Sequence, residues 1–347
     1  MVDFAGWEMP QQYTSVKEEQ EAVRTRGGVF DVSHMGRFQV RGAAAGDFLQ
    51  GVVTNDVGRL APNRAQYNLL CRPDGGIVDD LVVYRSDGAW LVVVNAGNRD
   101  KDLAWLRDRA PSGVDVVDRS DELGLLALQG PEAERLLPAV DVDVTGLRYF
   151  GITQGTMAGA RSLISRTGYT GEDGFELFVP VAHLADVWDE LLSAGVRPCG
   201  LAARDVCRLE AGLRLYGSDM DETTNPYEAG LGWTVKLAKG DFVGRDALQR
   251  IREAGPRREL VGLGCADRGI PRHGAAVRQG GRMIGEVTSG TYSFWLGHGI
   301  AMASVEAAAA PAGSQVEIDT RSGGAAAEVV PLPFYRGSAR RTAVAQG

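Results

Sequence analysis

Two adjacent carboxylates are the first feature of this sequence that suggests chemistry. Asp79 and Asp80 interrupt an otherwise apolar stretch that runs from Ile77 to Arg85. Aspartate is disfavoured in β-strands, so a pair inside one calls for an explanation. Because neighbouring side chains of a strand point to opposite faces, one carboxylate can face a ligand while the other is paired elsewhere. Two interpretations stay open: general acid–base catalysis, or a structural pair bound to arginine or backbone N–H groups.

A polar, glycine-rich stretch from Arg166 to Gly174 is the second candidate. Its three glycines predict close backbone approach or a loop with positive φ. The stretch has neither the G-x-G-x-x-G spacing of a dinucleotide site nor the pattern of a phosphate-binding loop. Glu176 follows it among large apolar residues. A carboxylate in that setting is paired or functional, unless it occupies a solvent-facing strand position.

The remaining polar candidates favour plainer interpretations. Arg204 and Asp205, taken alone, indicate a surface ion pair early in a helix. The loop 217–222 lacks the full spacing of a calcium loop, and its acids are explained by solvation. The four histidines and four cysteines are dispersed, so we expect no metal site and no Ser-His-Asp or Cys-His arrangement. The residues alone indicate an α+β protein with a carboxylate-lined pocket.

Several short elements must position these residues. Ser15 to Glu18 forms a capping box that opens a helix ending near Arg26. Tight turns between apolar runs predict an antiparallel meander. The expected strands are 67–70, 77–85, 90–94, 124–129 and 174–179, and the expected helices are 100–109, one beginning at Pro131, 181–194 and 201–211.

A domain boundary is predicted near residues 253–258, where Gly-Pro and charges break the pattern. Beyond it, short apolar runs separated by glycines predict a small all-β barrel or sandwich. These runs are 260–263, 275–277, 283–287, 300–305 and 315–318. The chain is therefore divided into 1–255, 256–337 and a tail, 338–347, that we expect to be frayed.

Composition narrows the class of partner. The 347 residues include 37 lysines and arginines against 45 aspartates and glutamates, a net charge of −8, which argues against nucleic-acid binding. No apolar run approaches the length of a membrane span, and the first residues lack the pattern of a signal peptide. The cysteines are expected to be inert buried thiols in a reducing compartment, and we predict a cytoplasmic location without a membrane partner.

Over most of its length, from Phe4 to about Phe334, the chain resembles the aminomethyltransferase (T-protein) family of the glycine cleavage system. Each matching block alone is weak evidence because it is short, but the occurrence of so many blocks in the family's order is highly specific. The blocks are 4–10, 30–35, 75–80, 126–131, 168–174, 202–205, 208–213, 215–217, 271–274 and 285–290.

The resemblance implies an α+β fold, a three-domain cloverleaf with two interleaved α+β domains and a C-terminal β-barrel. It implies tetrahydrofolate as co-substrate and the lipoylated H-protein as partner in glycine breakdown, with no metal. The methylene of the aminomethyl group on the dihydrolipoyl arm passes to tetrahydrofolate, giving 5,10-methylenetetrahydrofolate and ammonia. Because the folate amines attack, such an enzyme mainly orients two substrates and needs no nucleophilic side chain.

Individual residues follow from the same resemblance. Asp80 matches the family's catalytic carboxylate near the folate amines. Glu176 matches its pterin-binding glutamate, because a carboxylate can accept two parallel N–H groups. The aromatic residues among the folate-lining positions suit flat rings. Those positions are Arg204, Tyr169, Tyr67, Asn95, Met35 and Trp233.

Two other functions of the same fold stay open. A tetrahydrofolate-dependent O- or S-demethylase would differ in its donor. A folate-binding iron–sulfur assembly factor would carry a cysteine where Asp241 stands. The chain departs from the family pattern at Phe294-Trp295, and it has fewer residues before Phe4, which leaves open a truncated start or a missing first strand.

Overall fold

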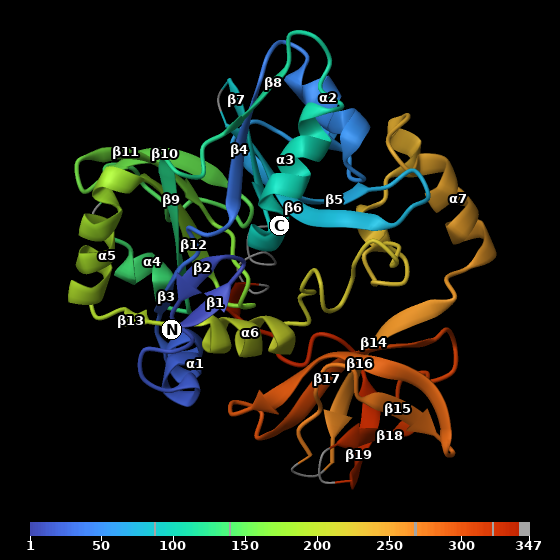
Figure 1. The fold of residues 1–347 in the computed structure, drawn as a ribbon. Helices are drawn as coiled ribbons and strands as arrows, with labels where there is room; N and C mark the ends of the chain where they lie inside the picture. The colour runs from blue at the N-terminus through green and yellow to red at the C-terminus, as the bar shows by residue number, and fades with distance from the viewer. Residues whose placement is uncertain (87, 139, 267–268, 321–322, 340–347) are drawn as a thin grey trace.

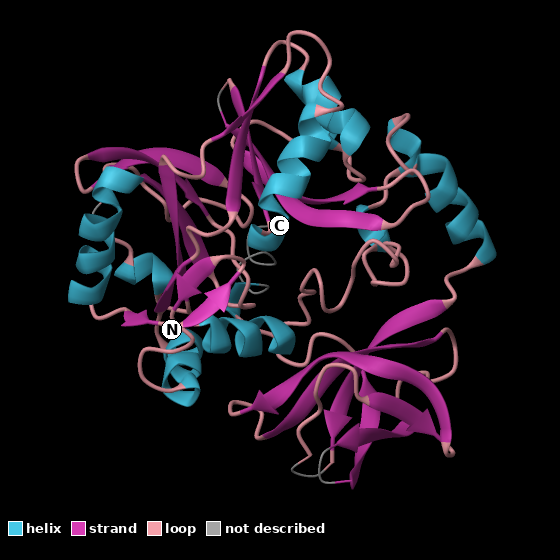
Figure 2. Ribbon diagram, viewed as in Figure 1, coloured by secondary structure: helices cyan, strands magenta, loops and turns pink. Residues whose placement is uncertain are grey.

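The computed structural model describes residues 1–86, 88–138, 140–266, 269–320 and 323–339. Figure 1 shows three lobes: two contain both helices and strands, and the third, at the C-terminal end, is built of strands. Figure 2 shows the helices lying on the outer sides of the two mixed lobes and between the lobes. Within the described residues, no helix is both long and apolar enough to cross a membrane.

The first mixed lobe is built on a six-stranded sheet with the order β10-β11-β12-β9-β3-β13. Its strands are β3 (Gly28–Asp31), β9 (Leu123–Gln129), β10 (Ile152–Met157), β11 (Ala160–Ser165), β12 (Gly174–Pro180) and β13 (Arg197–Pro198). Helices α4 (Ala133–Leu136) and α5 (Leu184–Ser193) pack on one face, where Val187 and Leu191 meet Leu126 and Leu177.

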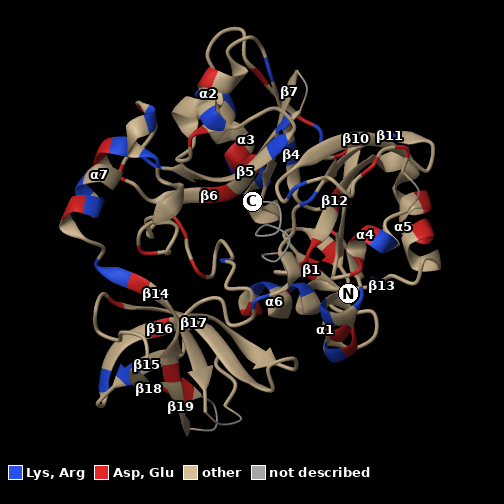
Figure 3. Cartoon of the chain, turned by 180° about the vertical axis from the view of Figure 1, so that it is seen from behind, with Lys and Arg blue, Asp and Glu red and all other residues tan. Residues whose placement is uncertain are grey.

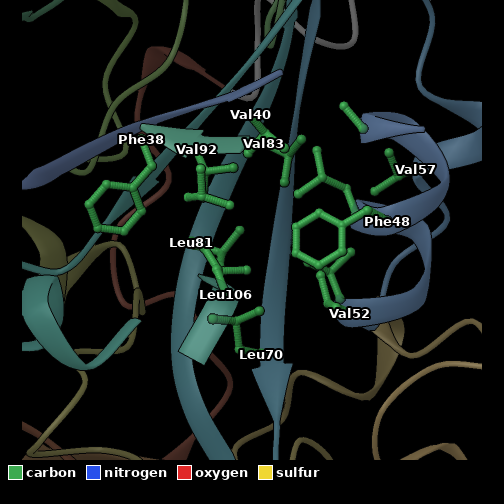
Figure 4. Close-up of a cluster of buried hydrophobic side chains, with 14 of the residues drawn as sticks. Phe38, Val40, Phe48, Val52, Val57, Leu70, Leu81, Val83, Val92 and Leu106 are labelled. Carbon is green, nitrogen blue, oxygen red and sulfur yellow. The ribbon is translucent and has the colours of Figure 1, made fainter. Parts of the chain in front are cut away.

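The second mixed lobe is built on a five-stranded sheet with the order β5-β6-β7-β4-β8. Its strands are β4 (Gly36–Arg41), β5 (Arg64–Cys71), β6 (Ile77–Ser86), β7 (Ala89–Val94) and β8 (Asp115–Asp118). Strands β5, β6 and β7 pair antiparallel, which confirms the predicted meander. Helices α2 (Ala45–Val52) and α3 (Arg99–Arg107) cover one face, and Figure 4 shows Phe48 and Leu106 directed at Leu81 and Val83.

The two mixed lobes are interleaved in the chain, as the family resemblance implies. Strand β3 belongs to the first sheet, the chain then builds the second sheet through β8, and it returns to the first sheet at β9. Apolar residues of both sheets share one buried cluster, in which Tyr84 of β6 packs edge-on against Phe178 of β12. Side chains on facing sides of the two sheets are therefore brought together.

The third lobe is a closed six-stranded barrel with the order β14-β17-β16-β15-β18-β19. Its strands are β14 (Arg258–Cys265), β15 (Ala276–Gln279), β16 (Arg282–Ser293), β17 (His298–Glu306), β18 (Gln315–Thr320) and β19 (Gly323–Val330). Because the strand order closes on itself, this lobe is a barrel, and the alternative of a sandwich is excluded. Strand β19 was not predicted, because its glycines and alanines have low strand propensity. Its small Ala325 and Ala327 fit the crowded barrel interior.

The remaining elements connect the lobes. They are the hairpin β1 (Val2–Phe4) and β2 (Trp7–Met9), the helices α1 (Val16–Thr25), α6 (Leu201–Glu210) and α7 (Arg245–Ala254), and the 3₁₀ turns η1 (Val57–Arg59), η2 (Ala96–Asn98), η3 (Val181–His183), η4 (Gly232–Thr234) and η5 (Leu237–Lys239). Figure 3 shows acidic and basic residues interspersed along α7, as expected for a helix whose outer face meets solvent.

Two local predictions need correction. The helix expected to begin at Pro131 begins at Ala133, after a turn that the N–H of Ala133 closes on the carbonyl of Gly130 at 3.0 Å. The segment expected as one helix over 181–194 divides into the turn η3 and the helix α5.

The expected fraying of the tail 338–347 is wrong for its first two residues. The backbone N–H of Ser338 donates to Glu172 Oε2 at 2.9 Å, and its hydroxyl accepts from the backbone N–H of Asp173 at 2.8 Å. Ala339 is buried. These polar partners hold the chain against the glycine-rich loop of the first lobe. Residues 340–347 lie outside the described residues.

A buried ion pair network fastens α1 to the other lobes. Arg24 lies between two carboxylates, at 2.9 Å from Glu172 and 2.6 Å from Glu210, and all three side chains are buried. Its guanidinium lies 4.3 Å from the ring centre of Tyr335, which follows the barrel. Glu210 also accepts a hydrogen bond from Ser293 of β16. One arginine thus joins an N-terminal helix, α6 and the C-terminal segment.

We expect Arg24→Met to cost about 3–5 kcal/mol of unfolding free energy, because it leaves two buried carboxylates without their cation. Urea unfolding measures the loss. Arg26→Met is the matched control, since Arg26 is exposed and lies 3.8 Å from Glu132 on the surface. Equal losses in the two variants would contradict this account of the network.

Candidate functional site

The two adjacent aspartates of β6 occupy opposite faces of the strand, as the alternation of side chains requires. Asp79 faces α3 and is fully buried. Its Oδ1 accepts hydrogen bonds from Asn95 Nδ2 at 2.9 Å and Asn98 Nδ2 at 2.7 Å. Asp80, on the other face, keeps partial exposure to solvent. Asp79 is therefore the fully buried, paired carboxylate, and Asp80 is the one that keeps contact with solvent.

Two side chains orient the carboxylate of Asp80. Tyr67 OH donates to its Oδ2 at 3.0 Å, and Asn95 Nδ2 donates to its Oδ1 at 2.7 Å. Strand pairing places Leu69 opposite Asp80, so Tyr67, two residues earlier on β5, lies on the same sheet face. Burial, followed by the charge of Asp79, raises the pKa of Asp80 to about 7, although both hydrogen bonds oppose the rise. At neutral pH Asp80 can therefore both hold and accept a proton.

An aromatic surface lies beside Asp80. The ring of Tyr67 stacks on Trp233 of η4, with 5.9 Å between ring centres and an angle of 24° between planes. Trp233 is 58% exposed. Large exposed aromatic side chains are typical of surfaces that receive flat, partly apolar ligands.

A second group gathers around Arg204 of α6. Its guanidinium lies 4.7 Å from the ring centre of Tyr169, and its Nη2 lies 4.0 Å from Met35 Sδ. Its Nη1 is buried and has no acceptor within the described residues. The predicted surface ion pair with Asp205 is wrong: Asp205 pairs with Arg208 at 2.8 Å, because residues three apart on a helix share a face.

Glu176 of β12 is held at one of its two oxygens. Its Oε2 accepts hydrogen bonds from Tyr84 OH at 2.9 Å and Thr167 Oγ1 at 2.5 Å. The alternative of a plain solvent-facing position is therefore wrong. No hydrogen bond from another described residue reaches Oε1, which leaves that oxygen available to a donor from a ligand.

Strand β6 links the surroundings of Asp80 to those of Glu176. Asp80 and Tyr84 are four residues apart on one face, which places their Cα atoms about 13 Å from each other along the strand. Tyr84 then reaches across to Glu176 in the other sheet. Tyr84 and Thr167 were not among the predicted site residues, although the period of two along β6 places Tyr84 on the face of Asp80.

Electrostatic interactions connect both groups. Burial raises the pKa of Tyr169, and the charge of Asp80 raises it further. Burial lowers the pKa of Arg204, while Tyr169 and Glu176 oppose that change. Tyr169 therefore feels the charges of both Asp80 and Arg204, and Arg204 feels the charge of Glu176. A separate cavity of about 660 Å³ lies between α1, α6 and β16, and none of Asp80, Tyr169, Arg204 and Glu176 lines it.

The glycine-rich loop 166–174 shows both properties that its sequence predicts. Gly171 has a φ of +80°. Gly168 lies so close to Gln129 that an added Cβ would be 1.9 Å from its Oε1. The tight path of this loop places Thr167 and Tyr169 on either side of Gly168, at Glu176 and Arg204 respectively.

The interpretation of the loop 217–222 as solvated charge is wrong for Asp219. Asp219 is buried, pairs with Arg208 at 2.7 Å and accepts from Thr288 Oγ1 at 2.6 Å. It links α6 to the barrel.

Among the described residues, no group of three or more His, Cys, Asp or Glu side chains is arranged to hold a metal ion. The four cysteines are buried, and Cys71, Cys199 and Cys207 are free thiols.

Comparison with known families identifies the chain. Residues 1–239 match the GCVT N-terminal domain, and residues 258–336 match the glycine cleavage T-protein C-terminal barrel domain. The chain belongs to the glycine cleavage T-protein family. The resemblance seen in the sequence is thereby confirmed.

Relatives of this T-protein family member support the assignment over nearly the whole chain. It is 50% identical over 343 residues to an aminomethyltransferase of Geobacillus kaustophilus, covering 96% of this chain and 94% of the relative. It is 51% identical over 356 residues to one of Symbiobacterium thermophilum, covering 98% and 95%. The crystal structure of the glycine cleavage system aminomethyltransferase T from Bartonella henselae matches with a TM-score of 0.90 at 35% identity, covering 97% and 94%. This match confirms the predicted fold class.

Proposed function

We propose that this protein is the aminomethyltransferase of glycine cleavage. It transfers the methylene of the aminomethyl-dihydrolipoyl H-protein to tetrahydrofolate, giving 5,10-methylenetetrahydrofolate and releasing ammonia. The observation that carries the proposal is that Asp80 shares a face of β6 with Tyr84, and Tyr84 donates to Glu176 of the other sheet. The names of the relatives support the same reaction.

The side chains present fit a reduced folate. Glu176 Oε1 offers an acceptor for the paired N–H groups of a pterin, and Oε2 is already held by the protein. The stacked Tyr67 and Trp233 offer a flat apolar surface. The unpaired Nη1 of Arg204 offers a buried donor to an acceptor on the ligand. These contacts are proposed for Glu176, Arg204, Tyr169, Tyr67, Asn95, Met35 and Trp233.

Bound tetrahydrofolate would supply the amine nucleophiles that receive the methylene. Asp80 is proposed to hold or accept the proton at those amines, because its raised pKa lets it change charge near neutrality. Asn95 and Tyr67 fix the two oxygens of Asp80, so that little reorganisation is needed during transfer. Glu176 sets the orientation of the ring system from the opposite end.

The proposal extends to the organisation and location of the chain. Residues 1–255 would form the two folate-binding domains and 256–337 the barrel, a division supported by the separate sheets and the family matches. The buried thiols of Cys71, Cys199 and Cys207 are compatible with a reducing, cytoplasmic location.

The test is a coupled assay with purified protein, tetrahydrofolate and lipoylated H-protein carrying an aminomethyl group. We expect formation of 5,10-methylenetetrahydrofolate and ammonia in equal amounts, dependent on lipoylation. The control replaces the H-protein with its form lacking lipoate. Turnover with small O- or S-methyl compounds, together with none from the aminomethyl carrier, would select the demethylase instead.

A further inference from the structure

Behind the catalytic face of β6 lies a second carboxylic acid that the proposed reaction does not use. Asp102 of α3 is fully buried, and within the described ranges neither of its oxygens has a hydrogen-bond donor. It lies within hydrogen-bond reach of Asp79, on the face of β6 opposite Asp80. Two ionised carboxylates in this arrangement would repel each other in a poorly solvated place, and one of them would lack every hydrogen bond.

The hydrogen bonds of Asp79 show which of the two carries the charge. Asp79 accepts from Asn98 Nδ2 at 2.7 Å, from Asn95 Nδ2 at 2.9 Å and from the backbone N–H of Asn95 at 3.1 Å. Three donors suit an ionised carboxylate. Asp102 has none, so a proton on Asp102 converts the repulsion into a donated hydrogen bond. One proton and one negative charge then satisfy both groups.

Charged and titratable neighbours do not alter this assignment. Lys101 is the adjacent cation, but its ammonium donates to the carbonyl of Val78 at 2.7 Å and to Tyr216 OH at 3.1 Å. Glu222 lies 3.5 Å from the same ammonium. Burial, followed by the charge of Asp79, raises the pKa of Asp102 to about 11, whereas Lys101 lowers it and Asp80 raises it.

Asn95 transmits this arrangement to the catalytic face. The same Nδ2 group donates to Asp79 at 2.9 Å and to Asp80 Oδ1 at 2.7 Å. With Asp79 held from behind, the amide of Asn95 has one orientation in which both of its N–H groups find a carboxylate. The chain of contacts Asp102, Asp79, Asn95, Asp80 therefore runs through the sheet from α3 to the catalytic carboxylate.

We propose that Asp102 is a positioning residue: it stays protonated, donates its O–H to Asp79, and thereby holds Asn95 and the Asp80 carboxylate in the orientation that methylene transfer needs. This inference rests on the proposed function for its catalytic consequence. The protonation of Asp102 is a property of the folded chain and can be tested without turnover.

The first test uses the wild-type protein with carbonyl-¹³C aspartate, and Asp102→Asn assigns the signal. We expect the Asp102 carboxyl resonance to keep the chemical shift of the protonated acid from about pH 5 to about pH 9, far above the usual pKa of aspartate near 4. A resonance that reports an ionised Asp102 at neutral pH would overturn the proposal. This measurement holds even if the substrate of the enzyme proves to be different.

The second test compares two variants of similar size. Asp102→Asn keeps an N–H donor toward Asp79, and we expect its kcat to stay within about threefold of wild type. Asp102→Leu removes the donor, and we expect kcat to fall at least about tenfold with KM for tetrahydrofolate nearly unchanged. An equal loss of kcat in both variants, or none in Asp102→Leu, would overturn the positioning role. If Asp102→Leu fails to fold, the kcat of Asp102→Asn and the Asp102 carboxyl resonance of the wild-type protein still test the proposal.

Discussion

Asp80→Asn is expected to lower kcat by about 10²–10⁴-fold, the usual contribution of a positioned acid or base. Asparagine keeps the size of the side chain and an oxygen that Tyr67 can donate to, but it cannot hold or accept a proton at the folate amines. The dissociation constant for tetrahydrofolate should stay within about threefold, because the proposed pterin contact is made by Glu176. Turnover of the aminomethylated carrier and equilibrium binding of tetrahydrofolate measure the two quantities.

The pH profile provides an independent check on Asp80. Because burial and Asp79 raise the pKa of Asp80 to about 7, its ionised form declines as the pH falls through that value. If the ionised form is required, kcat/KM of the wild type should fall about tenfold for each pH unit below the midpoint. The residual activity of Asp80→Asn should lack this limb. A wild-type profile that is flat from about pH 5 to 8, or near-normal turnover in the variant, would remove Asp80 from the chemistry.

Glu176→Ala is expected to weaken tetrahydrofolate binding by at least about 30-fold, which corresponds to about 2 kcal/mol for the removal of a charge-assisted hydrogen bond at a partly buried site. Its kcat at saturating tetrahydrofolate should change much less, since Asp80 and its two orienting partners are untouched. Calorimetric titration of tetrahydrofolate into the folded variant gives the comparison.

Two further variants distinguish ligand binding from structural damage at Glu176. Glu132→Ala removes a partly exposed glutamate that pairs with Arg135 and Arg26 at the surface, and it should bind tetrahydrofolate normally. Tyr84→Phe removes one of two donors to Oε2 and should cause an intermediate loss of affinity, because Thr167 still holds Glu176. An unchanged dissociation constant in Glu176→Ala would exclude the pterin contact.

Local patterns in the sequence were sufficient for many elements. Ser15 caps α1 as predicted, because its Oγ accepts from the N–H of Glu18 at 3.2 Å and α1 begins at the next residue. Among the described residues the Glu18 side chain returns no hydrogen bond to Ser15, so only half of the capping box forms. The meander of β5, β6 and β7 follows from its turns. By contrast, α2 begins without a side-chain cap at Ala44, and α7 without one at Gly244, so neither helix had a start that could be recognised.

The order of short blocks along the chain pointed to the family, and the alternation along β6 predicted that its two aspartates face opposite ways. The choice of Asp80 as the catalytic candidate came from the family resemblance. Neither pattern could show that Arg24 is buried between two glutamates, that Asp219 joins α6 to the barrel, or that Glu176 is held by a tyrosine 92 residues away in the chain. Secondary structure depends on neighbours a few positions apart. The pKa and partners of a carboxyl group depend instead on the groups that folding brings around it, which is why the acid at position 102 became visible only beside Asp79.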